Sequence, residues 1–131
     1  MKGCTRVATL GLLLSSVAAA AEPKYAGFDV TDHDDPKVAF NFSAGDATST
    51  SPIVITVPGR KLTDDDRKHR VDLQKHWISL HKPEGSVLVS RTLNECGLER
   101  KGEYPFCDVY TFEDSKTKKR YEFYIYVGNW P

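Results

Sequence analysis

Three histidines close together in the sequence are the first residues whose type suggests chemistry. His69, His76 and His81 carry imidazoles, which bind metal ions or exchange protons near neutral pH. On a strand His76 and His81 would point to opposite faces, and on a helix only His69 and His76 would share a side. The spacing therefore predicts no metal site, and we interpret these residues as surface histidines that flank a tryptophan.

Hydrolysis is a second chemistry that the residue types allow. A small secreted hydrolase acting on RNA or cell-wall glycan needs an acid and a base, and for RNA a cation over the phosphate. Residues of these types are His69, His76, His81, Glu103, Arg91 and Arg100. No spacing singles them out, and no G-x-S-x-G motif is present. A hydrolase therefore stays an alternative without assigned catalytic residues, and the sequence implies no cofactor.

The cysteines predict a disulfide. Cys4 lies near the N-terminus, which leaves Cys96 and Cys107 as a pair. In an oxidising compartment these two are expected to bond, since a redox motif would need closer spacing and a zinc site more ligands. The bond would tether a loop that carries Tyr104 and Phe106, and a loop ordered in advance binds a partner at a lower entropic cost.

Alternating residues near the C-terminus predict an aromatic sheet face. The expected inward set is Tyr121, Phe123, Ile125 and Val127. Tyr124 and Tyr126 then point outward, and Tyr110 of the preceding strand is expected to join them. Exposed tyrosines suit a protein partner or stacking on a sugar. The alternative is a fold that buries both faces of this sheet.

Composition excludes several classes of protein. The chain has 131 residues, with 18 Lys and Arg against 18 Asp and Glu. A polytopic membrane protein, a disordered acidic tail and a strongly basic nucleic-acid binder each need a different composition. Acidic residues interrupt or flank the two basic clusters, which we interpret as solvated turns, with binding of an anionic ligand as the alternative. The clusters are Arg60–Lys61 with residues 67–70, and Lys116 with residues 118–120.

The N-terminal residues 1–21 are typical of a signal peptide. Lys2 and Arg6 precede an apolar run over residues 7–17, and small alanines follow it. The run is shorter than the roughly 20 residues that cross a bilayer, so we predict cleavage rather than a membrane anchor. Residues 22–131 would then form one secreted domain, extracellular in most hosts or periplasmic in a bacterium.

The rest of the chain predicts mainly strands. Apolar alternation, β-branched runs and turn residues indicate strands over residues 25–30, 37–43, 53–57, 71–81, 86–93, 108–112 and 120–127. Thr63 and Asp66 form a capping-box pattern for a short helical turn. About seven strands predict an all-β fold, a small antiparallel sandwich or barrel. The alternative is an α+β fold with a helix at about residues 63–82.

These observations favour a non-enzymatic, exported binding protein of the effector, inhibitor or immunity type. The residues expected to contact a protein partner are Tyr110, Tyr124, Tyr126, Tyr104 and Phe106. The alternatives are the small hydrolase and a carbohydrate-binding module, which would use the same aromatic face. No nucleic-acid partner and no retained membrane anchor are expected.

Overall fold

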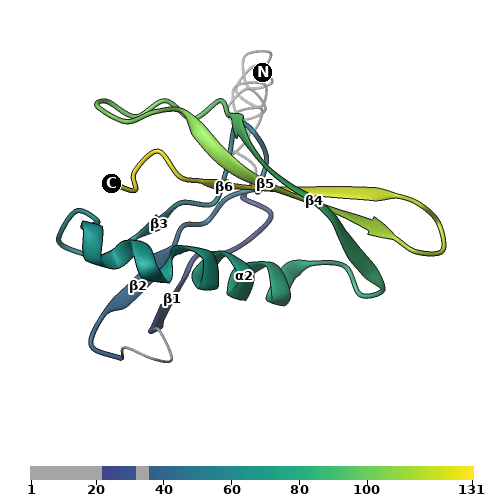
Figure 1. Ribbon diagram of the computed structural model, residues 1–131, viewed down its shortest axis with the longest axis horizontal. Coiled ribbons are helices and arrows are strands. Elements are labelled where there is room, and N and C mark those ends of the chain that lie inside the picture. Colours follow the sequence, from purple (N-terminus) through teal and green to yellow (C-terminus); the bar gives the residue numbers. More distant parts are fainter. Residues whose placement is uncertain (1–21, 32–35) are drawn as a thin grey trace, which may run out of the picture.

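Two three-stranded antiparallel sheets and one α-helix make up the part of the protein that the structure describes (Figure 1). The computed structural model describes residues 22–31 and 36–131, so the predicted signal peptide lies outside the described residues. The first sheet contains β1 (Phe28–Thr31), β2 (Ala39–Phe42) and β3 (Ile55–Thr56). The second contains β4 (Ser86–Glu95), β5 (Phe106–Asp114) and β6 (Arg120–Tyr126). The prediction of a β-rich fold is confirmed, but the arrangement is not the expected sandwich of about seven strands.

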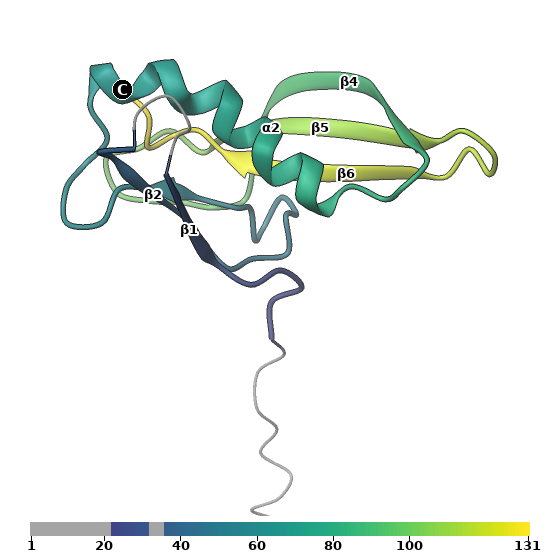
Figure 2. The same cartoon turned by 90° about the horizontal axis from the view of Figure 1, so that it is seen from below.

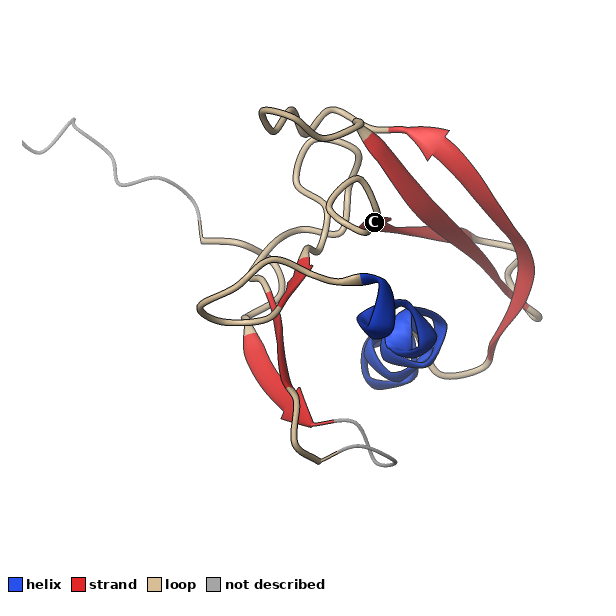
Figure 3. Ribbon diagram, turned by 60° about the vertical axis from the view of Figure 1, so that its left-hand side comes forward, coloured by secondary structure: helices blue, strands red, loops and turns tan. Residues whose placement is uncertain are grey.

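The helix α2 (Arg70–His81) lies between the two sheets and completes one shared core (Figure 3). It continues a short 3₁₀ helix, η2 (Asp64–His69). The core residues on the helix are Leu73, Trp77 and Ile78, and those on the sheets are Phe40, Phe42, Ile55, Tyr110, Phe112, Phe123 and Ile125. In the described part of the chain, no helix is long and apolar enough to cross a membrane.

The strand predicted over residues 71–81 is wrong, because these residues form α2, as the alternative interpretation expected. The buried side of η2 and α2 includes the polar residues His69 and Gln74 together with Leu73 and Trp77. Leu80, by contrast, is 58% exposed. Polar residues on the buried side and an apolar residue on the exposed side hide the period of an amphipathic helix.

The predicted capping box is present where the helical segment begins. The backbone N–H of Thr63 donates to Asp66 Oδ2 over 2.7 Å. Arg60 donates to both carboxylate oxygens, Nη1 to Oδ2 over 2.7 Å and Nη2 to Oδ1 over 3.1 Å. These bonds, that of Arg60 foremost, lower the pKa of Asp66 from 3.8 to about 2 although burial opposes the shift. Asp66 therefore fixes the β3–η2 connection as well as the helix start.

We expect the capping carboxylate of Asp66 to make the protein sensitive to acid. Its pKa is lower in the folded than in the unfolded state, so its stabilising effect is present above pH 4 and is lost as the pH falls towards about 2. Since Arg60 is partly exposed, solvent screening limits the loss to about 1 kcal/mol. Urea unfolding of wild type and Asp66→Asn across this range measures it. The exposed Asp64→Asn is the matched control, and an equal acid response in Asp66→Asn and wild type would contradict the assignment.

The second sheet is built largely as its sequence predicts. β5 and β6 form the expected hairpin, in which Tyr110 pairs with Phe123. Gly85 has the positive φ of 82° required by the turn before β4. In the first sheet, β2 and β3 are neighbours as predicted. Figure 2 shows the sheet with β4 at one edge and β6 at the other.

Both faces of the second sheet are covered near its centre. One face meets α2, and the other carries a separate apolar cluster of Cys96, Cys107, Val109 and Tyr126, with Val54, Leu98 and Tyr124 against it. Backbone hydrogen bonds join Ile53 to the outer edge of β6, from Ile53 N–H to Tyr124 O over 3.0 Å and from Tyr126 N–H to Ile53 O over 2.8 Å. The outer edge of β6 is therefore paired with residues from the first half of the chain.

Candidate functional site

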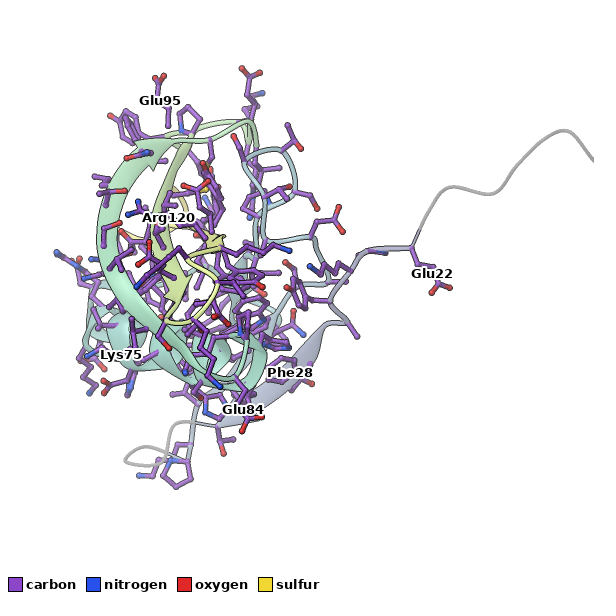
Figure 4. The ribbon with its side chains drawn as sticks, turned by 90° about the vertical axis from the view of Figure 1, so that its right-hand side faces the viewer. Glu22, Phe28, Lys75, Glu84, Glu95 and Arg120 are labelled. Carbon is purple, nitrogen blue, oxygen red and sulfur yellow. A yellow bond between two sulfur atoms is a disulfide. The ribbon has the colours of Figure 1, made fainter. Side chains whose placement is uncertain are left out.

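The strand β4 is an open edge of the second sheet. Its only strand partner is β5, and within residues 22–31 and 36–131 the one backbone hydrogen bond on its outer side is the turn bond from Ser86 N–H to Pro83 O at its start. Figure 4 shows β4 as the outermost ribbon, running from near Glu84 to Glu95. Nine of its ten residues are exposed. The edge therefore presents unpaired backbone donors and acceptors to solvent.

Apolar side chains are concentrated on this open edge. Four of the six large hydrophobic side chains that are exposed in the described residues belong to β4: Val87, Leu88, Val89 and Leu93. Leu88 and Leu93 stand opposite Phe112 and Asp108 of β5, which places them on the face towards α2. Proteins usually protect an edge strand with charge, proline or a covering segment. Here a bulge between Leu88 and Ser90 is present, but the apolar surface stays open.

A pocket lies at the C-terminal end of β4, and we call it the Leu93–Tyr104 pocket. Its volume is about 320 Å³. Leu93 and Tyr104, which are 63% and 75% exposed, both line it and are the two most exposed large apolar side chains described. The other lining residues are Arg70, Phe106, Asp108, Val127, Gly128 and Trp130. The pocket combines apolar walls with two charged groups, an arrangement that suits a protein side chain.

A buried polar network supports the wall of this pocket. Asp108 Oδ2 accepts from Gln74 Nε2 over 2.8 Å and from Arg91 Nη2 over 3.0 Å. Tyr110 donates its hydroxyl to Gln74 Oε1 over 2.6 Å, and burial raises the pKa of Tyr110. The network ties α2 to β4 and β5, so the edge strand is held in place although its side chains are exposed.

No known family, curated protein or solved structure matches this chain. Its function is therefore inferred from the geometry of its own residues.

The structure does not bring the three sheet tyrosines together on an exposed face. Tyr110 is 2% exposed and lies on the side that faces α2, whereas Tyr124 and Tyr126 lie on the opposite side. Tyr126 is fully buried, and burial together with its hydrogen bond to Glu103 raises its pKa to about 12. The expected exposure of Tyr110 and Tyr126 is therefore wrong. Val54 and Leu98 pack on one face and α2 on the other, a long-range packing that the alternation along β6 does not reveal.

The predicted disulfide is present, and the loop that it tethers contributes to the candidate site. Cys96 and Cys107 are bonded, which confirms the pairing. Tyr104 and Phe106 from the tethered loop both line the Leu93–Tyr104 pocket. Of the five residues predicted to contact a partner, these two remain part of the candidate site.

The histidines and the other residues considered for hydrolysis are dispersed. Each of these three histidine rings packs on an aromatic ring: His69 on Phe40, His76 on Phe42 and His81 on Trp77. Arg91 belongs to the Asp108 network, whereas Arg100 pairs with Glu103 over 3.1 Å in the tethered loop. In the part of the chain that the structure describes, no group of three or more acidic, histidine or cysteine side chains could hold a metal ion.

The exposed residues of β4 were missed by the sequence analysis, although a signal is present. Val87, Leu88 and Val89 are three consecutive apolar residues. Successive side chains on a strand point to opposite faces, so such a run places apolar groups on both faces. Whether such a run is exposed depends on which other segments pack against the strand, and the local sequence does not show this.

Proposed function

We propose that this chain is an exported, non-enzymatic binding protein that takes up an extended segment of a partner protein along β4. The observation that carries the proposal is a ten-residue strand whose outer edge has no strand partner among the described residues and on which four large apolar side chains are exposed. An added strand satisfies the outer backbone groups of such an edge, and its alternate side chains contact the apolar residues. The partner segment is therefore extended and itself carries alternating apolar residues.

The Leu93–Tyr104 pocket supplies a place for one anchoring side chain of the partner. It adjoins β4 through Leu93, and its opposite rim is Tyr104 of the disulfide-tethered loop. Aromatic residues at the rim give a large contact area for few rotatable bonds. Because the disulfide limits the movement of the rim, little ordering is needed when the partner binds.

Export is supported by two independent features. The chain begins with a signal-like sequence, and a disulfide is present in the domain that follows. Disulfides persist mainly in proteins that leave the reducing cytosol. An effector, inhibitor or immunity protein working outside the cell fits both features.

The test selects peptides that bind the purified protein from a random library. The library peptides have about ten residues, the upper end of the usual strand length. We expect selected peptides to carry alternating apolar residues and to slow hydrogen exchange at every second amide of β4, those that point outward. Leu93→Lys should weaken binding by about tenfold or more. Leu80→Lys is the matched control, since Leu80 is similarly exposed but lies on α2.

Three results would overturn this proposal. The first is exchange protection outside β4, and the second is an equal loss of binding in Leu80→Lys and Leu93→Lys. The third is a stable dimer in sedimentation equilibrium that Leu93→Lys dissociates, because the edge would then be occupied by a second copy. Both substituted leucines are exposed, so each variant should keep the unfolding temperature of the wild type.

A further inference from the structure

A second cavity has basic walls and shares Gly128 and Trp130 with the Leu93–Tyr104 pocket, and we call it the basic cleft. Its volume is about 370 Å³. Three segments far apart in sequence form it: residues 56–62 around the start of the helical region, residues 100–103 of the tethered loop, and residues 128–131. The cleft contains no residue of β4.

Four cationic side chains line this cleft: Arg60, Lys61, Arg100 and Lys101. Glu103 is the one acidic side chain among the described residues that line it. The whole chain is formally neutral, so this is a local positive region rather than part of a generally basic surface. The sequence separates the two pairs by about 40 positions, and only the fold brings them to one cavity.

The arginines of the basic cleft form ion pairs with acidic side chains of the described residues, whereas its lysines do not. The guanidinium of Arg60 is held by both oxygens of Asp66, and that of Arg100 by Glu103 over 3.1 Å. Fixed guanidinium groups present their remaining N–H donors in a defined direction. Lys61 and Lys101 make no ion pair within the described residues, so their charges are available to a ligand.

Two unpaired polar atoms are buried in residues that form the wall of the basic cleft. Trp130 Nε1 and Asn129 Oδ1 are buried without a hydrogen-bond partner, and both residues line the basic cleft. They are two of the three such side-chain atoms in residues 22–31 and 36–131, the third being Trp77 Nε1 in the core. Asn129 is held in place because its Nδ2 donates to Ile55 O over 2.7 Å. Native proteins leave few buried polar atoms unpaired, and such atoms often mark a site for water, an ion or a ligand.

We propose that the basic cleft binds a small phosphate or sulfate ester. The two free lysines neutralise the oxyanion, whose oxygens also accept charge-assisted hydrogen bonds from the remaining N–H groups of the fixed arginines. The body of the ligand lies against the wall formed by Asn129 and Trp130. This function is additional to partner binding at β4.

The experiment follows the two indole N–H signals in ¹⁵N–¹H spectra of the protein during titration. The probes are inorganic pyrophosphate in one arm and a sulfated disaccharide in the other, with sodium chloride at matched ionic strength as the blank. We expect saturable shifts of the Trp130 signal, which Trp130→Phe identifies, while the Trp77 signal stays fixed. Saturation by pyrophosphate assigns a phosphate ligand, and saturation by the disaccharide alone assigns a sulfate ester.

Charge variants separate a site from a general charge effect. Lys61→Gln/Lys101→Gln should weaken binding about tenfold, as expected from the loss of two charge contacts. Lys75→Gln/Lys116→Gln removes the same charge away from the cleft, at exposed positions of α2 (Figure 4) and the β5–β6 turn, and should leave binding unchanged. Equal weakening in the two double variants, or no saturable shift of Trp130 with either probe, would overturn the proposal.

Discussion

Trp77→Ala is expected to lower the free energy of unfolding by about 4 kcal/mol, the largest effect of any single substitution considered for this protein. Trp77 is fully buried on α2, between the two sheets. Its ring centroid lies 5.0 Å from that of Tyr25, 4.1 Å from that of His81 and 5.8 Å from that of Phe123. Removing it would empty the centre of the shared core, since the rings around it come from different elements that cannot all move inward.

Urea unfolding at neutral pH measures this loss, with two further variants as references. Leu80→Ala lies on the same helix but at an exposed position, so its cost should stay under about 1 kcal/mol. Trp77→Phe should cost less than Trp77→Ala, because it keeps an aromatic ring and because the indole N–H has no hydrogen bond to lose. A loss below about 1 kcal/mol in Trp77→Ala would show that α2 does not join the two sheets as described.

The local features of the fold were predictable because neighbouring residues determine them. The β5–β6 hairpin follows from strict alternation around Phe123 and Ile125, and the helix start from the spacing of Thr63 and Asp66. The disulfide follows from counting, since one pairing remains once Cys4 is set aside. In each case the signal and the structure lie within the same short segment.

Features that depend on distant segments were not predictable in this way. Gln74 reads as a solvent-facing helix residue until Asp108 and Tyr110, more than 30 positions later, supply its hydrogen bonds. Tyr126 reads as an outward tyrosine until Val54 and Leu98 join its apolar cluster and Glu103 accepts its hydroxyl hydrogen bond. The same limit applies to the candidate site, because the exposure of β4 depends on what fails to cover it rather than on its own residues.

Removing the disulfide is expected to lower the free energy of unfolding by about 3 kcal/mol. Cys96 and Cys107 are separated by 11 positions, so the bond restricts the unfolded chain by closing a loop of moderate length. Cys107 is also fully buried in the second apolar cluster. Cys96→Ala/Cys107→Ala removes the bond without placing a hydroxyl there, whereas reduction of the wild type keeps both sulfur atoms.

Comparing these two forms separates the effect of the bond from that of packing. Both should unfold at clearly lower urea concentration than the oxidised protein, and the reduced wild type should lose less than the alanine pair because its core volume is kept. The bond also holds the loop that carries Tyr104, so peptide binding at β4 should weaken under conditions where the reduced protein is still folded. The opposite result is a change of less than about 1 kcal/mol in the free energy of unfolding on reduction, with peptide affinity intact. The backbone hydrogen bonds from Cys96 N–H to Pro105 O and from Gly97 N–H to Ser49 O would then suffice to order the loop. The disulfide would then have no part in shaping the rim of the Leu93–Tyr104 pocket.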